Sequence, residues 1–479
     1  SWASRGLGDV YKRQDLFDVP TIRYSYRFND YSIINPEYSV FYDTYSAFYY
    51  LIKSANTVIY VANSEKISWE LEDEKRRVLA EARFFRAFAY RNLAELFGGV
   101  PIVTELSMIP RYDYSRASRM EVYDFAINEL ESILNDLPET TPKIGKLVRA
   151  AAQHNLSQLY IDKGVLYGND SKSIEAYNKA ISYASDVIDS GLYNLMTERF
   201  GTRKNENPEF YYATTTVDQT LEHSYSSAGY SIKGNVYWDL FQLGNQDYQT
   251  GNREAIWCAQ SDYDVYKSDG AKAALGYPGL FSPVVRDQGA PYWGGNLEDA
   301  GGHGMTQIMP TTYARDLIYE GKWAEDLRNS DAVFRRTILG NIKGTEYYGK
   351  KIPWEILYRI DGNGKWEDAA YTQLYPISCK VANDYFKQTE EGGRLKLIFR
   401  DNYLIRLSET ILLRAEAYHR LGNNTKAAED INILRSRAQC SYLVTSSDIS
   451  IDLILDERAR ELLYDCLLYT SDAADDRIS

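Results

Sequence analysis

The sequence predicts a mainly α-helical protein, in which a scaffold of paired helices carries a loop-rich insert with short strands. Three observations predict this fold class. Apolar residues recur every three or four positions over about residues 38–191 and 400–465, the period of a helix with one buried face. Short turns, most of them containing glycine, separate consecutive helical stripes. Over about residues 192–373 the stripes shorten, Gly and Asn cluster, and six of the eight tryptophans occur.

The scaffold begins with three predicted helices. The first covers residues 38–62, where apolar side chains alternate in steps of four and three from Phe41 to Ile59. The second ends at Gly98 and Gly99, which can adopt a left-handed C-cap, and Pro101 cannot continue it. The third is expected over residues 119–137, because Pro138 ends it. The inward positions of the second helix are predicted to be Val78, Ala82, Phe85, Ala89, Leu93 and Leu96.

Two helical pairs are predicted next. The first joins a helix that begins near residue 148 and closes near Gly164 to a helix that closes at Gly191. The second joins a helix that starts at Leu404 and closes at Gly422 to a helix over residues 427–438. Antiparallel helices with short turns are αα-hairpins, the unit of tetratricopeptide-like arrays. The inward residues of the second helix of the first pair are predicted to be Ile174, Tyr177, Ile181, Ala184 and Ile188.

Composition excludes some classes of partner and favours others. The formal net charge of −13 and the lack of a dense Lys/Arg run argue against a nucleic-acid partner. The 42 tyrosines favour a binding surface, since a tyrosine offers a flat apolar ring and a hydroxyl. No apolar run approaches the 18 or so residues that cross a bilayer. The four cysteines, which have no metal-ligand spacing and are expected to be buried thiols, are Cys258, Cys379, Cys440 and Cys466.

The two ends of the chain do not continue the periodicity of their neighbours. Residues 1–14 and 466–479 look like translated adapter sequence. Their charges of +2 and −2 cancel, so the charge of −13 belongs to residues 15–465. We therefore expect one domain over residues 15–465.

One string and several landmarks resemble a known family. Glu81-Ala-Arg-Phe-Phe-Arg-Ala87, followed about ten residues later by Leu96-Phe-Gly-Gly-Val-Pro101, closely resembles the signature of the SusD/RagB family. Ile52-x-x-Ala55-Asn56, Asn252-x-Glu254-x-Ile256, Met309-Pro-Thr311 and Glu457-Arg458-x-x-Glu461-Leu462 resemble family landmarks in the same order. The resemblance touches most of the chain, although the usual continuation after the last landmark is replaced at Cys466.

The resemblance implies both a fold and a role. Family members are cell-surface nutrient-binding lipoproteins of Bacteroidetes, built on four tetratricopeptide-like hairpins, and glycans are their usual cargo. They normally begin with a secretion signal and an acylated cysteine that anchors them to the outer membrane on its extracellular face. They deliver the cargo to a TonB-dependent transporter of the SusC type. The resemblance therefore implies capture and delivery of an oligosaccharide without catalysis.

Motifs for catalysis, cofactors and metals are lacking in the sequence. His154, His223, His303 and His419 are scattered outside any HExxH spacing, and no P-loop, G-x-S-x-G or Rossmann fingerprint occurs. Asp262-x-Asp264 and Asp269-Gly270 hint at a calcium loop, but Tyr266 and Lys267 break the EF-hand template. We therefore predict no enzyme, no cofactor and no metal site.

The best site candidates lie between the Ile256 strand and the Pro310 helix. A sugar site needs an aromatic ring to stack on the pyranose and planar polar groups to bind its hydroxyls. The segment from Pro291 to Asn296 supplies both within six residues. The predicted ligand-binding residues are Trp293, Tyr292, Asn296, Arg286, Tyr277, Asp287 and Tyr266. Weaker candidates in and before this region are Tyr263, Phe281, Gln288, Asp299, Arg23, Tyr24, Tyr26, Asn29, Asp30 and Tyr31, whereas Trp69 and Trp238 are expected to be packing residues.

Three alternatives to a glycan-binding role remain open. A peptide-binding relative would share the scaffold and differ in cargo. An enzyme would need a carboxylate pair at a set separation, which no motif selects. A pure interaction scaffold would bind no small ligand.

Overall fold

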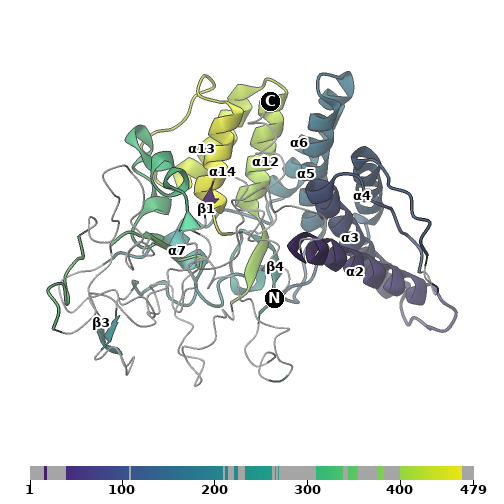
Figure 1. Cartoon of the computed structure of the whole chain (residues 1–479), viewed down its shortest axis with the longest axis horizontal. Coiled ribbons are helices and arrows are strands. Elements are labelled where there is room, and N and C mark those ends of the chain that lie inside the picture. The colour runs from purple at the N-terminus through teal and green to yellow at the C-terminus, as the bar shows by residue number, and fades with distance from the viewer. Residues whose placement is uncertain are drawn as a thin grey trace.

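The computed structural model describes residues 16–18, 39–106, 109, 111–208, 211–213, 221–224, 232–261, 265, 268, 309–337, 344–353, 376–381 and 400–465. Within them, long helices form one side of the molecule and short strands and turns lie beside them (Figure 1). The long helices are α2 (Ser39–Ala62), α3 (Glu72–Phe97), α4 (Arg119–Ile133), α5 (Arg149–Tyr167), α6 (Ser171–Ile188), α12 (Leu407–Arg420), α13 (Asn424–Arg437) and α14 (Ile451–Leu462).

The helices pack as a continuous array of neighbours. Helix α2 packs on α3, α3 on α4, α4 on α5 and α5 on α6. Helix α12 then packs on α6 and on α13, so the late hairpin continues the early array (Figure 1). The mainly α, hairpin-built scaffold that the sequence predicts is confirmed.

The rest of the described chain forms short antiparallel strand pairs and turns. The predicted strand at Ile256 is confirmed, and so is the helix after Pro310, where the hydroxyl of Thr311 accepts a hydrogen bond from the amide of Ala314. The strand pairs are β1 (Phe17–Asp18) with β5 (Met309–Pro310), β2 (Tyr211–Ala213) with β3 (Leu221–Ser224), β4 (Ala255–Ala259) with β8 (Asn402–Arg406), and β6 (Phe334–Arg335) with β7 (Ile377–Ser378). The short helices are α7 (Val236–Leu240), η3 (Tyr248–Thr250), α10 (Thr312–Arg315), η6 (Leu317–Tyr319), η7 (Gly321–Trp323) and η8 (Leu327–Asn329).

Two residues of the motifs quoted above cross-link the first three helices. The guanidinium of Arg86 on α3 pairs with Glu129 of α4 at 2.6 Å and donates to Asn56 Oδ1 of α2 at 2.7 Å. The amide of Asn56 donates in turn to the Val103 carbonyl at 2.9 Å. Arg86 and Asn56 are buried, so they act here as structural residues.

Helix α3 is buried more widely than a single stripe. Ala82, Ala89 and Leu93 are buried as predicted. The other three predicted inward residues, Val78, Phe85 and Leu96, are only half-buried. Residues on other faces are completely buried as well, namely Phe84, Ala87, Tyr90 and Ala94. The physical reason is that α2, α4 and α5 all contact α3. Gly98 ends the helix with a positive φ of 73°, as expected.

Four predicted details are wrong. Helix α4 ends at Ile133, because the next turn changes to an i→i+3 hydrogen bond from Asp136. Helix α5 runs past Gly164 and ends at Tyr167, and Gly168 is its C-cap. Leu404 lies in β8 rather than in a helix, because β8 pairs with β4. On α6 the buried stripe consists of Ala176, Tyr177, Ala180, Ala184 and Val187, whereas Ile174 is 55% exposed.

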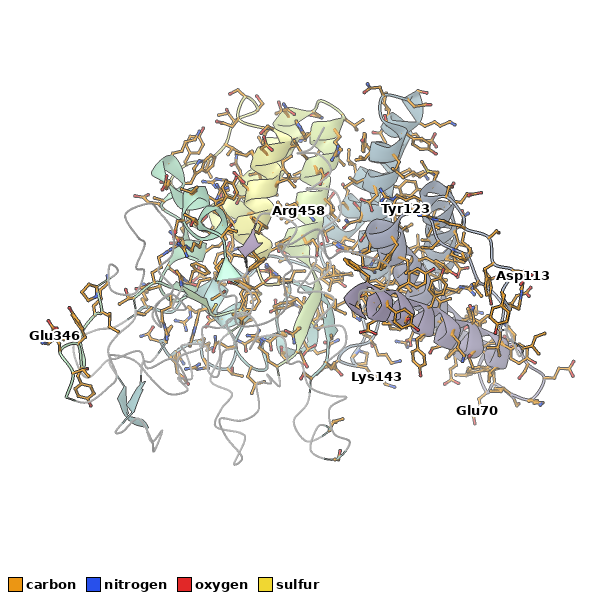
Figure 2. The ribbon with its side chains drawn as sticks, viewed as in Figure 1. Glu70, Asp113, Tyr123, Lys143, Glu346 and Arg458 are labelled. Carbon is orange, nitrogen blue, oxygen red and sulfur yellow. The ribbon has the colours of Figure 1, made fainter. Side chains whose placement is uncertain are left out.

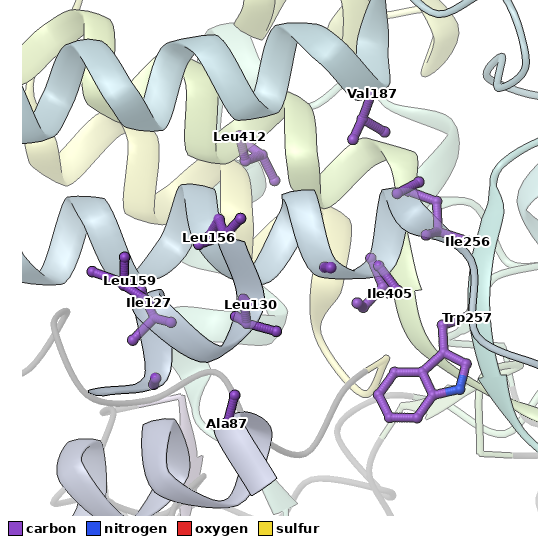
Figure 3. Packing of buried hydrophobic residues seen from close by; sticks show 14 of the residues in the cluster. Ala87, Ile127, Leu130, Leu156, Leu159, Val187, Ile256, Trp257, Ile405 and Leu412 are labelled. Carbon is purple, nitrogen blue, oxygen red and sulfur yellow. The ribbon is translucent and has the colours of Figure 1, made fainter. Parts of the chain in front are cut away.

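The hydrophobic core runs from the scaffold into the β4–β8 pair. Leu156 and Leu159 of α5, Ile127 and Leu130 of α4, and Leu412 of α12 are buried in one cluster with Ile256, Trp257 and Ile405 of the two strands (Figure 3). Three exposed acidic residues mark the periphery (Figure 2). Glu70 and Asp113 occupy one edge of the molecule and Glu346 the opposite edge, all three exposed (Figure 2).

Gly164 allows α5 and α6 to approach closely. A Cβ atom added there would lie 2.4 Å from the ring of Tyr177, whose side chain is buried. We expect Gly164→Ala to destabilise the protein by about 1–2 kcal/mol, because overpacking outweighs the better helix propensity of alanine. Urea unfolding would measure the change. Ser182→Ala on the exposed face of α6 is the control, and an equally small effect of the two substitutions would contradict the close-packing argument.

Candidate functional site

The predicted ligand-binding residues lie outside the described residues. This holds for Trp293, Tyr292, Asn296, Arg286, Tyr277, Asp287 and Tyr266, and for the weaker candidates, including residues 23–31. They remain predictions. The hinted calcium residues Asp262, Asp264 and Asp269 also lie outside the described residues. The two tryptophans expected to be packing residues are described: Trp238 is buried, and the half-buried Trp69 donates its indole N–H to the Ala62 carbonyl at 3.1 Å.

The structure describes the base of the candidate segment, that is, the residues directly before it in the chain and the residues that they contact. Strand β4 leads to Ser261, after which the candidate segment begins, and Asp401 lies directly before β8. The amide of Ser261 donates to Asp401 Oδ1 at 2.7 Å. The guanidinium of Arg400, buried beside it, donates to the carbonyls of Phe241 and Lys380. Side-chain hydrogen bonds therefore fix both positions.

A hydrogen-bonded carboxyl pair lies at this base. Asp247 is 5% exposed and its carboxyl shares a hydrogen bond with Asp401. Burial, followed by the hydrogen bond and the charge of Asp401, raises the pKa of Asp247 to about 7. Two carboxyls in direct contact are closer than the roughly 5–9.5 Å that glycoside hydrolysis requires. This pair therefore lacks the geometry of glycosidase carboxylates.

The shared proton predicts a pH dependence of stability. The pKa of Asp247 is about 7 when folded, against an ordinary 3.8, so the native state holds an extra proton between these values. Stability from this group is therefore full below about pH 4 and decreases as the pH rises toward 7. Asp247→Asn keeps a hydrogen-bond donor without titrating. We expect it to be more stable than the wild type at pH 8, on the order of 2 kcal/mol, with the difference vanishing near pH 4.

Urea unfolding at pH 4, 6 and 8 would measure this difference. Asp73→Asn serves as a control because Asp73 is exposed at the start of α3. A pH-independent difference between the wild type and Asp247→Asn would show that no proton is shared.

Trp257 fills the space between β4 and the signature helix. Its ring meets Phe84, Phe85 and Phe88 edge-on, with centroids 5.3, 5.9 and 5.5 Å away. The hollow beside it, lined also by Tyr193 and Asp247, holds about 20 Å³, room for about one water. Trp257 is therefore a packing residue, and this hollow is too small for a sugar ring.

A buried network of charges joins the short strands to the last helices. Glu461 of α14 contacts Arg437 at 2.5 Å, Arg406 at 3.0 Å and Arg328 at 3.1 Å. Glu254, next to β4, contacts Arg437 at 2.5 Å and Arg406 at 3.0 Å. The other ion pairs of this network are Glu457 with Arg328, Arg435 and Arg460, Asp326 with Arg328, and Asp465 with Lys380 and Arg406.

The electrostatics of the network indicate a structural role. Burial alone would raise the pKa of Glu461, but the charges of three arginines outweigh it and hold the pKa well below its ordinary value of 4.5. The same balance lowers the pKa of Glu457, through Arg328 first. A carboxylate kept ionised and enclosed by arginines can neither exchange protons near neutral pH nor reach a ligand.

His154 and the described cysteines are structural too. His154 is buried between α5 and α12, with Nδ1 2.8 Å from the Thr410 hydroxyl and Nε2 3.4 Å from Glu409. Cys258, Cys379 and Cys440 are buried thiols that form no disulfide among the described residues, as predicted, whereas Cys466 is not described. Among the described residues, no group of three or more His, Cys, Asp or Glu side chains is arranged to hold a metal ion. In the same part of the chain, every helix is too short or too polar to span a bilayer.

Sequence reasoning missed the Asp247–Asp401 pair and the charge network. The pair carries no local signal, because its members are far apart in the chain. A signal for the network was present, since Glu457 and Glu461 are the two acidic residues of the quoted Glu-Arg-x-x-Glu-Leu motif.

Comparisons with known proteins agree with the geometry. The scaffold of helical hairpins places the chain in the same fold class as SusD-like proteins. The sequence profile of the SusD family matches residues 209–466, more than half of the chain. A second profile, described as starch-binding associating with the outer membrane, matches residues 13–161. The chain belongs to the SusD/RagB family, as the signature helix indicated.

Individual relatives are more distant. The chain is 28% identical over 163 residues to a SusD-like protein of Bacteroides ovatus, covering 33% of this chain and 30% of that protein. It is 26% identical over 405 residues to the starch-binding protein SusD of Bacteroides thetaiotaomicron, covering 81% of this chain and 62% of that protein. The chain thus spans less than two thirds of the length of these two curated relatives.

Solved structures share the fold. One, a crystal structure with a xylogluco-oligosaccharide, has a TM-score of 0.62 at 18% identity and covers 99% of this chain and 78% of its own. Another, a SusD superfamily protein from Bacteroides thetaiotaomicron, has a TM-score of 0.60 at 19% identity, with 97% and 86% covered.

Proposed function

We propose that this protein binds an oligosaccharide at the cell surface and passes it on without cleaving it. The observation that carries the proposal is membership of the SusD family over residues 209–466. Two relatives support it by name: one is a starch-binding protein, and one is solved with a xylogluco-oligosaccharide. The described residues add that the candidate carboxyl pair lacks hydrolase geometry.

The proposed site is the segment that follows Ser261 in the chain. Trp293 and Tyr292 would stack on the apolar face of a sugar ring, and Asn296, Arg286 and Asp287 would bind its hydroxyls, with Tyr277 and Tyr266 as further ring contacts. Stacking with a few hydrogen bonds gives moderate affinity, which permits release. The buried contacts around β4 and β8 support this role, because they hold the base of the segment firmly.

Delivery to a partner is the second half of the proposal. The profile that matches residues 13–161 is described as starch-binding associating with the outer membrane. We infer that the protein is lipid-anchored on the extracellular face of that membrane, beside a SusC-type TonB-dependent transporter. Co-purification of the protein with a co-expressed SusC-type transporter would test this inference. Separate elution of the two proteins in detergent would count against it.

One binding screen separates the alternative functions. The purified protein would be applied to an array of starch, xyloglucan, arabinan and mucin-type oligosaccharides and, in parallel, to a peptide library. Binding to a glycan with no release of reducing sugar supports the proposal. Binding to peptides alone would assign a peptide-binding role, and release of sugar that an Asp or Glu substitution abolishes would assign an enzyme.

Trp293→Ala is expected to weaken glycan binding by roughly 1–3 kcal/mol, the contribution of one buried aromatic contact. Isothermal titration with the best glycan of the array would measure the loss. Trp69→Ala is the matched control, because Trp69 lies outside the candidate segment and contacts the end of α2. Equal affinities of the wild type and Trp293→Ala would remove Trp293 from the site.

A further inference from the structure

A hollow of about 360 Å³ lies at the end of the α5–α6 hairpin, away from the candidate segment in the sequence. The first turns of α5, the last turn of α6 and the loops next to them form its walls. Its volume is at the lower end of the roughly 300–1,000 Å³ that small-molecule sites occupy. It is therefore large enough for a small ligand, unlike the hollow beside Trp257.

The floor of the hollow is apolar and well packed. Ala150 and Tyr193 are about 5% and 4% exposed, and Val187, which points from the last turn of α6 into the core, is 1% exposed (Figure 3). Side chains this deeply buried give the hollow a rigid wall but little exposed apolar surface, so recognition of a ligand would depend on its polar rim.

The rim of the hollow is polar and partly fixed by hydrogen bonds. Arg149 Nε donates to the Leu134 carbonyl at 2.8 Å and its Nη1 pairs with Glu139 at 3.0 Å. Gln153 Nε2 approaches Asp186 Oδ2 at 3.4 Å, a long contact that a ligand hydroxyl could replace. Guanidinium, amide and carboxylate groups are the planar partners that hydroxyls need.

The charge of the rim selects against anions. Glu139 and Asp186 are acidic and Arg149 alone is basic among the lining residues. Asp189 acts on Asp186 from close by and is itself paired with Arg414 at 3.4 Å. Burial raises the pKa of the Asp186 carboxyl, and the charge of Asp189 adds to this effect. A phosphate, sulfate or uronic acid would meet this negative rim, whereas a neutral polyol would not.

We propose that the hollow between the ends of α5 and α6 is a second saccharide site, on the helical scaffold, that takes a single neutral sugar ring. The proposal rests on the proposed function, since it assumes a glycan-binding protein, but it uses different residues. Such a site would hold a branch or a terminal unit of a longer glycan while the candidate segment holds its main chain.

Ligand-observed NMR with glucose, galactose, mannose and xylose, each titrated to 50 mM, roughly the weak-affinity range of single-ring ligands, tests the proposal directly. Glucuronate is the charged comparison. We expect at least one neutral sugar to saturate and glucuronate not to bind. Gln153→Ala and Asp186→Asn are expected to weaken that binding at least about fivefold, because each removes a hydroxyl partner. Asn178→Ala, an exposed amide on α6, is the matched control.

Two outcomes would overturn the proposal: no neutral sugar saturates, or the affinities of both rim variants equal that of the wild type. Thermal unfolding of each variant verifies that the hairpin stays folded. Trp293→Ala separates this proposal from the proposed function. If it abolishes oligosaccharide binding but keeps the single-sugar signal, two sites exist. A single-sugar signal without any oligosaccharide binding would instead contradict the proposed function and leave the hollow as a saccharide site.

Discussion

Glu461→Ala is expected to destabilise the protein by about 3–5 kcal/mol. The carboxylate is completely buried and contacts Arg406, Arg437 and Arg328. Its removal leaves three guanidinium groups in the interior with fewer counter-charges, so the cost is mainly that of uncompensated buried charge. Urea unfolding at pH 7 would measure the change in the free energy of unfolding.

Glu429→Gln is the matched control for this prediction. Glu429 also pairs with a cation, Lys426, at 2.7 Å, but both side chains are more than half exposed. Exposed pairs contribute only about 0–1 kcal/mol, so the control should be almost neutral. Comparable losses in the two variants would mean that burial of the network is not what makes Glu461 important.

Acidification offers an independent measurement of the same network. The pKa of Glu461 lies below 4.5 in the folded protein, so its stabilisation is present above about pH 4.5 and is lost as the pH falls further. The wild type should therefore lose stability on acidification more steeply than Glu461→Gln. Parallel acid-unfolding curves of these two proteins would contradict this linkage.

The scaffold could be predicted from sequence because its signals are local. Helix α2 begins within one residue of its predicted start and ends at the predicted Ala62, since the stripe from Phe41 to Ile59 is uninterrupted. Helix α13 (Asn424–Arg437) starts three residues before its predicted range of 427–438 and ends one residue before the predicted end. Each of these helices buries an apolar stripe that is visible in its own sequence, whichever helix packs against that stripe.

The errors arose where a distant segment decides the local structure. Residues 402–406 form a strand because β4 pairs with them. Their own sequence does not indicate this pairing. Gly164 looked like a helix end, but it lies inside α5 because the ring of Tyr177 needs the space. Ile174 looked like a core residue, but α6 turns its alanines toward α5 instead.

The candidate site was harder to predict than the fold. Aromatic and amide residues of the segment around Trp293 suit a sugar, but composition does not say which of them meet in space, and specificity depends on that geometry. The Asp247–Asp401 pair and the rim of the α5–α6 hollow each combine residues from separate elements. No single stretch of sequence contains a signal for either.

Trp257→Ala is expected to destabilise the protein by about 3–5 kcal/mol, because it empties the space between β4 and the rings of Phe84, Phe85 and Phe88. Urea unfolding would measure the loss, with Trp69→Ala as a control that should lose about 1 kcal/mol, since Trp69 is half-buried and outside the core. Because β4 leads into the candidate segment, glycan affinity of the folded variant should fall too. Full affinity at reduced stability would show that the segment holds its ligand independently of the core.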